Sequence, residues 1–169
     1  MKRYGFTIVE LIIIITIMGI LITLGVVNLN GSQANARDAK RKTDIETIAI
    51  HLETFYTSGT DGSISVGRYP STDELFGTDS NIRIPIVLRD IDLASVKAPG
   101  ISNISLFAAT NNLQTANNVI PSPTIDRYIY QPLQSDGTLC LNATQDCRKF
   151  NLYTLLENGD QLMVTSKNQ

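Results

Sequence analysis

The stretch "FTIVELIIIITIMGIL", residues 6–21, decides the fold of this chain of 169 residues. No residue from Leu11 to Val27 is charged. Together with Phe6–Val9, this run reaches roughly the 20 residues that an α-helix needs to cross the hydrocarbon core of a bilayer. Glu10 interrupts the apolar pattern, and a charged side chain in hydrocarbon costs at least about 2.5 kcal/mol. The sequence therefore predicts a membrane helix with an unexpected carboxylate near its start.

This helix is predicted to stay with the protein. A secretory signal peptide ends its apolar region at a small-residue cleavage site of the A-x-A type. Here the polar stretch 28–32 follows instead, with two Asn, one Gly and one Ser. These residues are weak helix formers, so we expect the helix to fray near Gly31.

The N-terminal sequence resembles the processing and assembly segment of type IV pilins and their pseudopilin relatives. That family has a short basic leader ending in Gly, then Phe, then a carboxylate as the fifth residue of the processed chain. Here these are Gly5, Phe6 and Glu10. The resemblance implies that a prepilin peptidase removes the leader (residues 1–5) on the cytoplasmic face and methylates the new amine of Phe6. The resemblance also implies that the N-terminus lies in the cytoplasm. Charge counting alone leaves this orientation undecided, because basic residues lie on both sides of the apolar helix.

The resemblance also gives Glu10 a role in assembly. Cleavage creates a positive amine on Phe6, which needs a partner when subunits stack helix against helix. An unpaired charge in a low dielectric is costly, so the Glu10 carboxylate of a neighbouring subunit is expected to supply that partner. The implied partners are other copies of the chain in a helical filament, the prepilin peptidase, the pilus assembly machinery and the membrane.

A second helical pattern follows the apolar run, so the helix is predicted to continue as residues 30–57 behind a hydrophobic half of residues 6–29. Its apolar residues recur at the i, i+3, i+4 spacing of one helix face: Ile45, Ile48, Ala49, Leu52, Phe55 and Tyr56. The remaining surface is predicted to be polar, with Arg37, Lys40, Arg41, Asp44, Glu46 and Glu53. The basic run 37–42 is interpreted as a solvated face that pairs with acidic residues of neighbouring helices. DNA or phospholipid headgroups are its alternatives, and no further feature supports nucleic acid.

The rest of the chain predicts a small antiparallel sheet. Residues 58–124 are expected to form a variable connecting region with one or two short helices, one capped by Ser71 and Glu74. Residues 125–169 contain the strand "RYIYQP" (127–132) and the hairpin "FNLYTLLENGDQLMVTS" (150–166), which turns at Asn158-Gly159. Three to four antiparallel strands would cover the apolar helix stripe with one face and leave the other wet. The fold class is therefore α+β.

The pilin resemblance extends to residues 36–56, 68–75, 130–140 and 147–161, and leaves the middle of the chain unsupported. It makes the globular part an exported domain. In an oxidising compartment a disulfide between Cys140 and Cys147 is the favoured interpretation. Two free thiols or a metal site are the alternatives.

The sequence offers little catalytic chemistry. His51 is the single histidine, and no phosphate-binding glycine loop occurs, so we predict neither an enzyme nor a cofactor, and no metal role for His51. Two carboxylate pairs, Asp90 with Asp92 and Asp136 with Asp146, lack a recognisable calcium-ligand spacing and are interpreted as solvated loop residues. Asn103 and Asn142 head glycosylation-type tripeptides.

The leading functional hypothesis is a type IV pilin, anchored in the cytoplasmic membrane before assembly and extracellular in a pilus afterwards. Such a filament would serve motility, adhesion or DNA uptake. Two alternatives stay open. One is a pseudopilin of a type II secretion or competence system, and the other is a membrane-anchored binding protein that does not polymerise.

Overall fold

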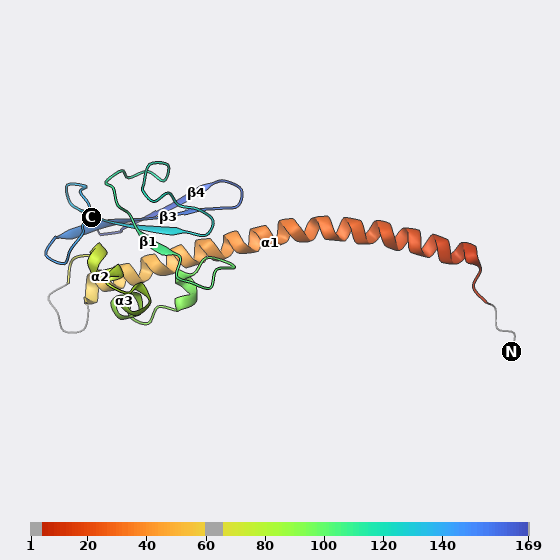
Figure 1. The fold of residues 1–169 in the computed structure, drawn as a ribbon, viewed down its shortest axis with the longest axis horizontal. Helices are drawn as coiled ribbons and strands as arrows, with labels where there is room; N and C mark the ends of the chain where they lie inside the picture. The colour runs from red at the N-terminus through yellow and green to blue at the C-terminus, as the bar shows by residue number, and fades with distance from the viewer. Residues whose placement is uncertain (1–4, 60–65, 169) are drawn as a thin grey trace. The chain divides into compact units, whose positions relative to one another are not determined.

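The computed structural model describes residues 5–59 and 66–168 (Figure 1), with the side chains of residues 26–30 excepted. Residues 1–4 of the predicted leader and residues 60–65 of the predicted connecting region lie outside the described residues. The chain divides into two compact units, residues 1–37 and residues 38–169. In chain order the helices are α1 (Ile8–Ser58), α2 (Thr72–Phe76), α3 (Ser80–Val87) and the 3-10 helix η1 (Leu93–Val96). The strands are β1 (Leu106–Ala108), β2 (Tyr128–Gln134), β3 (Cys147–Leu155) and β4 (Gln161–Thr165).

Helix α1 belongs to both units, and its two halves have different surfaces. In the first unit, Ile8–Gly25 is apolar and long enough to cross a membrane, and none of this window is buried. In the second unit, residues 38–58 are amphipathic and pack into the core. The helix continues through Gly31, so the expected fraying at that residue is wrong. Even the weakest helix former of this stretch, Gly31, costs only about 1 kcal/mol relative to Ala in a helix interior.

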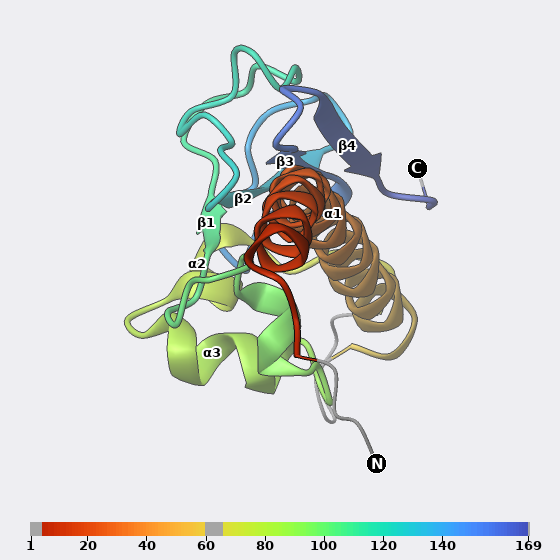
Figure 2. The same cartoon turned by 90° about the vertical axis from the view of Figure 1, so that its right-hand side faces the viewer.

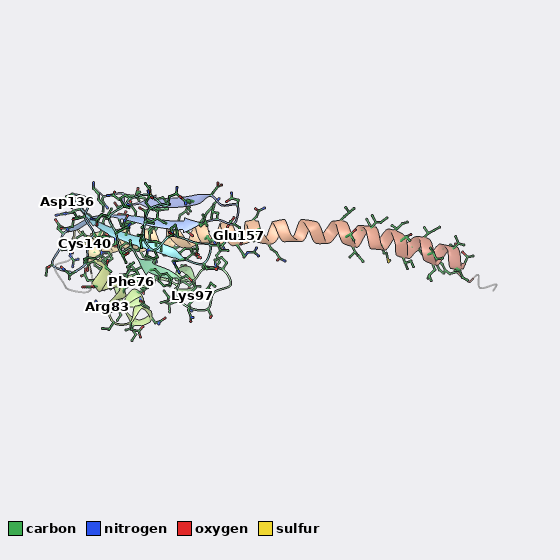
Figure 3. The ribbon with its side chains drawn as sticks, turned by 45° about the horizontal axis from the view of Figure 1, so that its top comes forward. Phe76, Arg83, Lys97, Asp136, Cys140 and Glu157 are labelled. Atoms are coloured by element: carbon green, nitrogen blue, oxygen red, sulfur yellow. A yellow bond between two sulfur atoms is a disulfide. The ribbon has the colours of Figure 1, made fainter. Side chains whose placement is uncertain are left out.

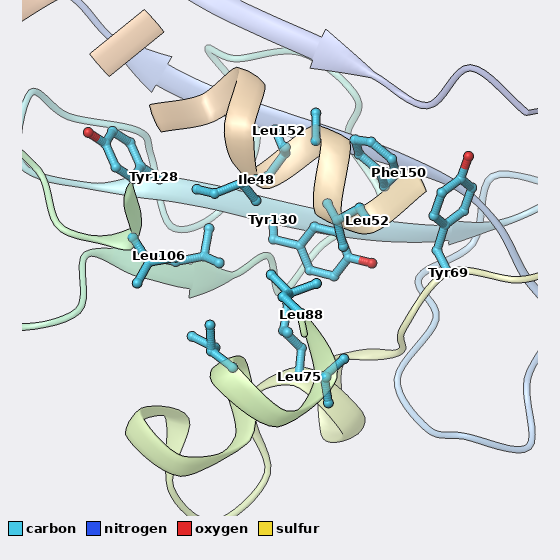
Figure 4. Packing of buried hydrophobic residues seen from close by; sticks show 14 of the residues in the cluster. Ile48, Leu52, Tyr69, Leu75, Leu88, Leu106, Tyr128, Tyr130, Phe150 and Leu152 are labelled. Atoms are coloured by element: carbon cyan, nitrogen blue, oxygen red, sulfur yellow. The ribbon is translucent and has the colours of Figure 1, made fainter. Parts of the chain in front are cut away.

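The main core of the second unit lies between α1 and one face of the sheet (Figure 4). The predicted apolar stripe of α1 forms the helix side of this core, where Ile45, Ile48 and Leu52 are completely buried. Burying one such side chain contributes about 1.5–3 kcal/mol. The sheet and the connecting region complete the core with Tyr69, Leu75, Leu88, Leu106, Tyr128, Tyr130, Phe150 and Leu152.

The sheet has four strands in the order β1-β2-β3-β4. Strands β2, β3 and β4 are antiparallel as predicted, with Tyr130 opposite Leu152 and Tyr153 opposite Met163. The fourth strand, β1, comes from the region that the sequence left undefined and pairs in parallel with β2. Parallel neighbours need a crossover connection of about a dozen residues or more, and residues 109–127 provide it. The sheet is therefore mixed.

The second face of the sheet was predicted to be wet, and this is wrong for the central strands. Ile129 of β2 and Tyr153 of β3 are completely buried there, in a small cluster with Ala109 and Val119. The crossover segment 109–120 covers them on the side of the sheet away from residues 38–58 of α1 (Figures 1 and 2). Both faces of β2 and β3 are thus inside the globular unit.

A buried glutamine ties this crossover segment to the sheet. Gln131 is completely buried, and its Nε2 donates hydrogen bonds to the carbonyl oxygens of Asn111 (2.8 Å) and Leu113 (3.1 Å). Its Oε1 accepts from the Tyr153 hydroxyl at 2.9 Å and from Asn151 Nδ2 at 3.1 Å. Every polar atom of this side chain therefore has a partner, which is what makes its burial tolerable.

Two local predictions are confirmed. Helix α2 has the complete capping box, since Ser71 Oγ accepts from the Glu74 N–H and the Glu74 carboxylate accepts from the Ser71 N–H. The β3–β4 hairpin turns at Asn158-Gly159, and Gly159 has a positive φ of 88° that a side chain rarely tolerates.

Candidate functional site

The residues predicted for processing and assembly lie together at the start of α1. Gly5, Phe6 and Thr7 precede the helix, and Phe6 is 79% exposed. Glu10 lies in the first helical turn. The roles of Gly5 and Phe6 in cleavage and methylation stay predictions.

Glu10 has a local partner that the sequence analysis missed. Its Oε2 accepts hydrogen bonds from the Thr7 N–H at 2.9 Å and from the Thr7 hydroxyl at 2.8 Å. In return the Glu10 N–H donates to Thr7 Oγ1 at 3.3 Å. This is the reciprocal capping box of the T-x-x-E pattern, and that spacing directly before an apolar run was the available signal. Among the residues that the structure describes, no basic side chain pairs with Glu10.

The helix behind this turn presents an apolar surface that its own unit does not cover. From Ile8 to Leu24 the large apolar side chains are between 40% and 79% exposed. Soluble proteins rarely expose a continuous apolar patch of more than a few hundred Å². This surface therefore requires lipid or other apolar helices around it.

Where α1 enters the globular unit, Arg41 forms a buried polar junction. Its side chain is only 1% exposed, and its Nη1 lies 2.8 Å from Asp38 Oδ1 and 3.2 Å from Glu157 Oε1. Its Nε donates to the Ile125 carbonyl at 2.7 Å. The interpretation of this part of the basic run as a solvated face is therefore wrong. Arg41 can be buried because carboxylates and a carbonyl satisfy its charge and its donors.

Asp44 is the second residue of the predicted polar face that is buried, at 4% exposure. Its Oδ2 accepts from Lys40 Nζ at 2.6 Å and from the Tyr128 hydroxyl at 2.8 Å. Burial, with the nearby Asp44 carboxylate, raises the pKa of Tyr128 well above its ordinary value. Two charged residues beside the apolar stripe of α1 thus bind the sheet region: Arg41 binds Glu157, and Asp44 binds Tyr128. Lys42, in contrast, is exposed.

The predicted disulfide between Cys140 and Cys147 is confirmed, and both cysteines are buried. The main chain of the segment after α1 binds both ends of this loop. Tyr69 N donates to the Cys147 carbonyl at 2.8 Å, and Thr72 N donates to the Cys140 carbonyl at 3.0 Å. The disulfide therefore supports the start of α2 as well as the sheet.

An ion pair closes the same region. Arg68 Nη1 and Nη2 each lie 2.6 Å from one oxygen of the Glu74 carboxylate, in the bidentate arrangement. Burial alone would raise the pKa of Glu74, but the hydrogen bonds from Arg68 and Ser71 outweigh it and lower the pKa below 4.5. Glu74 is therefore both the capping residue of α2 and the partner of Arg68.

Three of the four carboxylates weighed as calcium ligands, Asp92, Asp136 and Asp146, have other partners. Asp92 Oδ1 caps η1 by accepting from the Ala94 N–H at 2.9 Å. Asp136 Oδ1 accepts from the Thr138 N–H at 2.9 Å, and Asp146 pairs with Arg148 at 2.7 Å. Within residues 5–59 and 66–168, no group of three or more His, Cys, Asp or Glu side chains is placed to hold a metal ion.

These features define a class of protein, in which a small α+β unit shares one long helix with an apolar segment able to cross a membrane. The chain is similar to the type IV major pilin protein PilA of Myxococcus xanthus (strain DK1622), with 25% identity over 165 residues, covering 90% of this chain and 71% of that protein. This similarity, together with Gly5, Phe6 and Glu10 at the N-terminus, supports the type IV pilin and pseudopilin family.

The chain is also similar to two proteins of type II secretion systems. The type II secretion system core protein G of Dickeya chrysanthemi is 30% identical over 76 residues, which cover 45% of each protein. The core protein G of Aeromonas hydrophila is 31% identical over 84 residues, covering 50% of this chain and 52% of that protein. The matches thus span about half the length of these secretion proteins. No protein-family model and no solved structure matches the chain.

Proposed function

We propose that the chain is a type IV pilin. A prepilin peptidase cleaves it between Gly5 and Phe6 and methylates the Phe6 amine, and the processed chain polymerises through its N-terminal helix into a surface filament. The observation that carries this proposal is the position of Glu10 in the first turn of α1, within the apolar window Ile8–Gly25. None of that window is buried. The similarity to a major pilin along 90% of the chain supports it.

The apolar half of α1 gives this function a physical basis. Its large apolar side chains favour lipid before assembly and a bundle of sister helices after it. The proposed course is therefore a single-pass subunit in the cytoplasmic membrane with its N-terminus inside, followed by extraction into an extracellular pilus. The segments are assigned accordingly: leader 1–5, filament-core helix 6–29, amphipathic helix 30–57, connecting region 58–124 and sheet region 125–169.

Glu10 changes partners during this process. In the free subunit its carboxylate caps α1 through Thr7. In the filament it faces the Phe6 amine of a neighbouring subunit, where the two opposite charges pair in a low dielectric. Such pairing fixes the register of each added subunit, because a shifted subunit would leave both charges buried and unpaired.

Mass spectrometry of filaments sheared from the cell surface tests the proposal. We expect the assembled chain to begin at Phe6 with one methyl group on its amine. Recovery of chains that still begin at Met1 from assembled filaments would overturn the proposal.

The similarity to type II secretion core proteins favours a second candidate, a pseudopilin of a secretion or competence system. It shares the cleavage, the methylation and the role of Glu10, but not the long surface fibre. Abundance in sheared surface material separates the two, since a pseudopilin contributes little to it. A membrane-anchored binding protein that does not polymerise predicts instead that Glu10→Ala leaves function intact.

A further inference from the structure

Three tripeptides of the form Asn-x-Ser/Thr occur in the chain, beginning at Asn30, Asn103 and Asn142. In exported proteins this pattern marks acceptors for N-linked glycans. The transferase needs access to the Asn amide and to the hydroxyl two residues later. By that criterion the tripeptides at Asn103 and Asn142 differ, because only one of them is accessible in the structure. The side chain of Asn30 is not among the described ones.

The tripeptide at Asn142 is accessible throughout. It lies in the loop closed by the Cys140–Cys147 disulfide, where Asn142, Ala143 and Thr144 are all exposed. The Thr144 hydroxyl donates to Asn142 Oδ1 at 2.6 Å, and the Thr144 N–H donates to the same oxygen at 3.2 Å. These bonds hold the hydroxyl beside the amide and leave Asn142 Nδ2, the atom that would be modified, without a partner among the described residues.

The tripeptide at Asn103 has the same pattern and the opposite environment. Ser105 is 1% exposed, directly before β1. Its Oγ accepts from the Ala98 N–H at 3.0 Å, and its own N–H donates to the Val96 carbonyl at 2.8 Å. A transferase could reach this hydroxyl only if the segment between η1 and β1 came apart.

We infer that Asn142 is an acceptor for an N-linked glycan and that Asn103 in the folded chain is not. The donor is a glycan carried on a polyprenyl diphosphate. Asn142 Nδ2 attacks the anomeric carbon of the glycan, so a C–N bond forms and the C–O bond to the diphosphate breaks. The amide loses one proton, and the polyprenyl diphosphate leaves. The inference rests on the proposed function in one respect, that the globular unit lies outside the cytoplasmic membrane.

The position of the loop allows a bulky attachment. Asn142 N donates to Gln145 Oε1 at 3.1 Å, and Leu141 N donates to the same oxygen at 2.6 Å, so the loop is shaped largely by its own side chains. Figure 3 places Cys140 and Glu157 at opposite ends of the globular unit. A glycan on Asn142 would therefore leave the polar junction of Arg41, Asp38 and Glu157 undisturbed.

Mass spectrometry of the chain purified from the envelope of the cells that make it tests this inference. Trypsin separates the three tripeptides, because Asn30, Asn103 and Asn142 fall in the different peptides 6–37 (of the processed chain), 98–127 and 128–148. We expect added glycan mass on peptide 128–148 and none on peptide 98–127. The mass should be lost in Asn142→Gln and in Thr144→Val, and kept in Thr144→Ser, which retains the hydroxyl. The variants Asn103→Gln and Asn30→Gln should keep it as well.

An unmodified peptide 128–148, or a glycan that persists in Asn142→Gln, would overturn the inference. Protease treatment of intact cells separates this failure from that of the proposed function. A chain that begins at Phe6, is cut from outside and carries no glycan overturns the inference alone. A globular unit protected inside the cell overturns the inference and the proposed function together.

Discussion

Thr7 and Glu10 cap the first turn of α1 reciprocally, with the Thr7 N–H and hydroxyl 2.9 and 2.8 Å from the same carboxylate oxygen. The carboxylate that looked like a misfit in a membrane helix therefore accepts two hydrogen bonds from Thr7, one from its main chain and one from its side chain. A negative charge at a helix N-terminus is also favoured by the helix dipole. Cap and charge are two separable properties of Glu10, and they can be tested one at a time.

Glu10→Gln removes the charge and keeps the cap, because Gln also serves at this position of a capping box. We expect the variant to insert in the membrane and to be cleaved, since Gly5 and Phe6 are unchanged. Stranding a buried charge typically costs about 3–5 kcal/mol, which reduces subunit addition about a hundredfold or more. Fractionation should find processed monomer in the membrane and few or no filaments. Normal filaments from Glu10→Gln would show that the charge does not direct assembly.

Thr7→Val is the complementary variant, which removes the hydroxyl from the cap and keeps the charge. Loss of an N-cap costs about 0.5–2 kcal/mol of helix stability, far less than an unpaired buried charge. We expect Thr7→Val to form filaments at a level between those of the wild type and Glu10→Gln, as measured by the sheared fraction. Thr7→Ser retains the hydroxyl and should match the wild type. Equal loss in Thr7→Val and Glu10→Gln would contradict this order.

Arg41→Met should destabilise the globular unit by up to about 3–5 kcal/mol, because it leaves the carboxylates of Asp38 and Glu157 without their buried cation. The neighbouring Lys42→Met is the matched control. Lys42 is exposed, and surface substitutions usually change stability by less than about 0.5 kcal/mol. Urea unfolding of the full chains in detergent measures both. Similar midpoints for the two variants would show that the junction contributes little.

The Arg68–Glu74 pair should make stability depend on acid pH. The folded pKa of Glu74 lies below its ordinary value of 4.5, so the unfolded state binds its proton first as the pH falls. The stabilisation is complete above about pH 4.5 and is lost as the pH drops through the lower folded pKa. We expect Glu74→Gln to be less stable than the wild type at pH 7, and this gap in unfolding free energy to shrink in acid. A gap that does not vary with pH would contradict the assignment.

Removal of the disulfide by the double variant Cys140→Ala and Cys147→Ala should cost about 2–3 kcal/mol by the loop-entropy estimate. The start of α2 should loosen first, because Tyr69 and Thr72 bind the main chain of the two cysteines. Hydrogen exchange of these two amides measures the local effect. Thiol labelling of the unreduced, denatured wild type should find no free sulfhydryl, and labelling of both cysteines would contradict the bridge.

The elements with strong local signals could be predicted from the sequence. The helix stripe around Ile48 and Leu52, the Ser71 capping box and the turn at Asn158-Gly159 each follow from spacing or from one residue type. Strand β1 could not be predicted, because three residues carry too little periodicity and its parallel partner is set by the path of the crossover segment.

The buried charges were missed for a different reason. Arg41 and Asp44 were assigned to the surface by residue type, which is the right default for charged residues. Their burial depends on partners from distant segments, Glu157 for Arg41 and Tyr128 for Asp44. Such pairings exist only once the fold has formed, so local sequence patterns do not reveal them.

The loop between Cys140 and Cys147 offers a fixed attachment point for engineering. Its two ends are covalently joined with their Cα atoms 5.6 Å apart, so a peptide inserted after Thr144, outside the Asn142 tripeptide, would not have to hold the ends together itself. Lengthening a flexible loop costs only about 0.6 kcal/mol per doubling. An epitope or an enzyme-recognition tag grafted there would be carried once per subunit of the proposed filament, which would make that filament a scaffold with regularly repeated display.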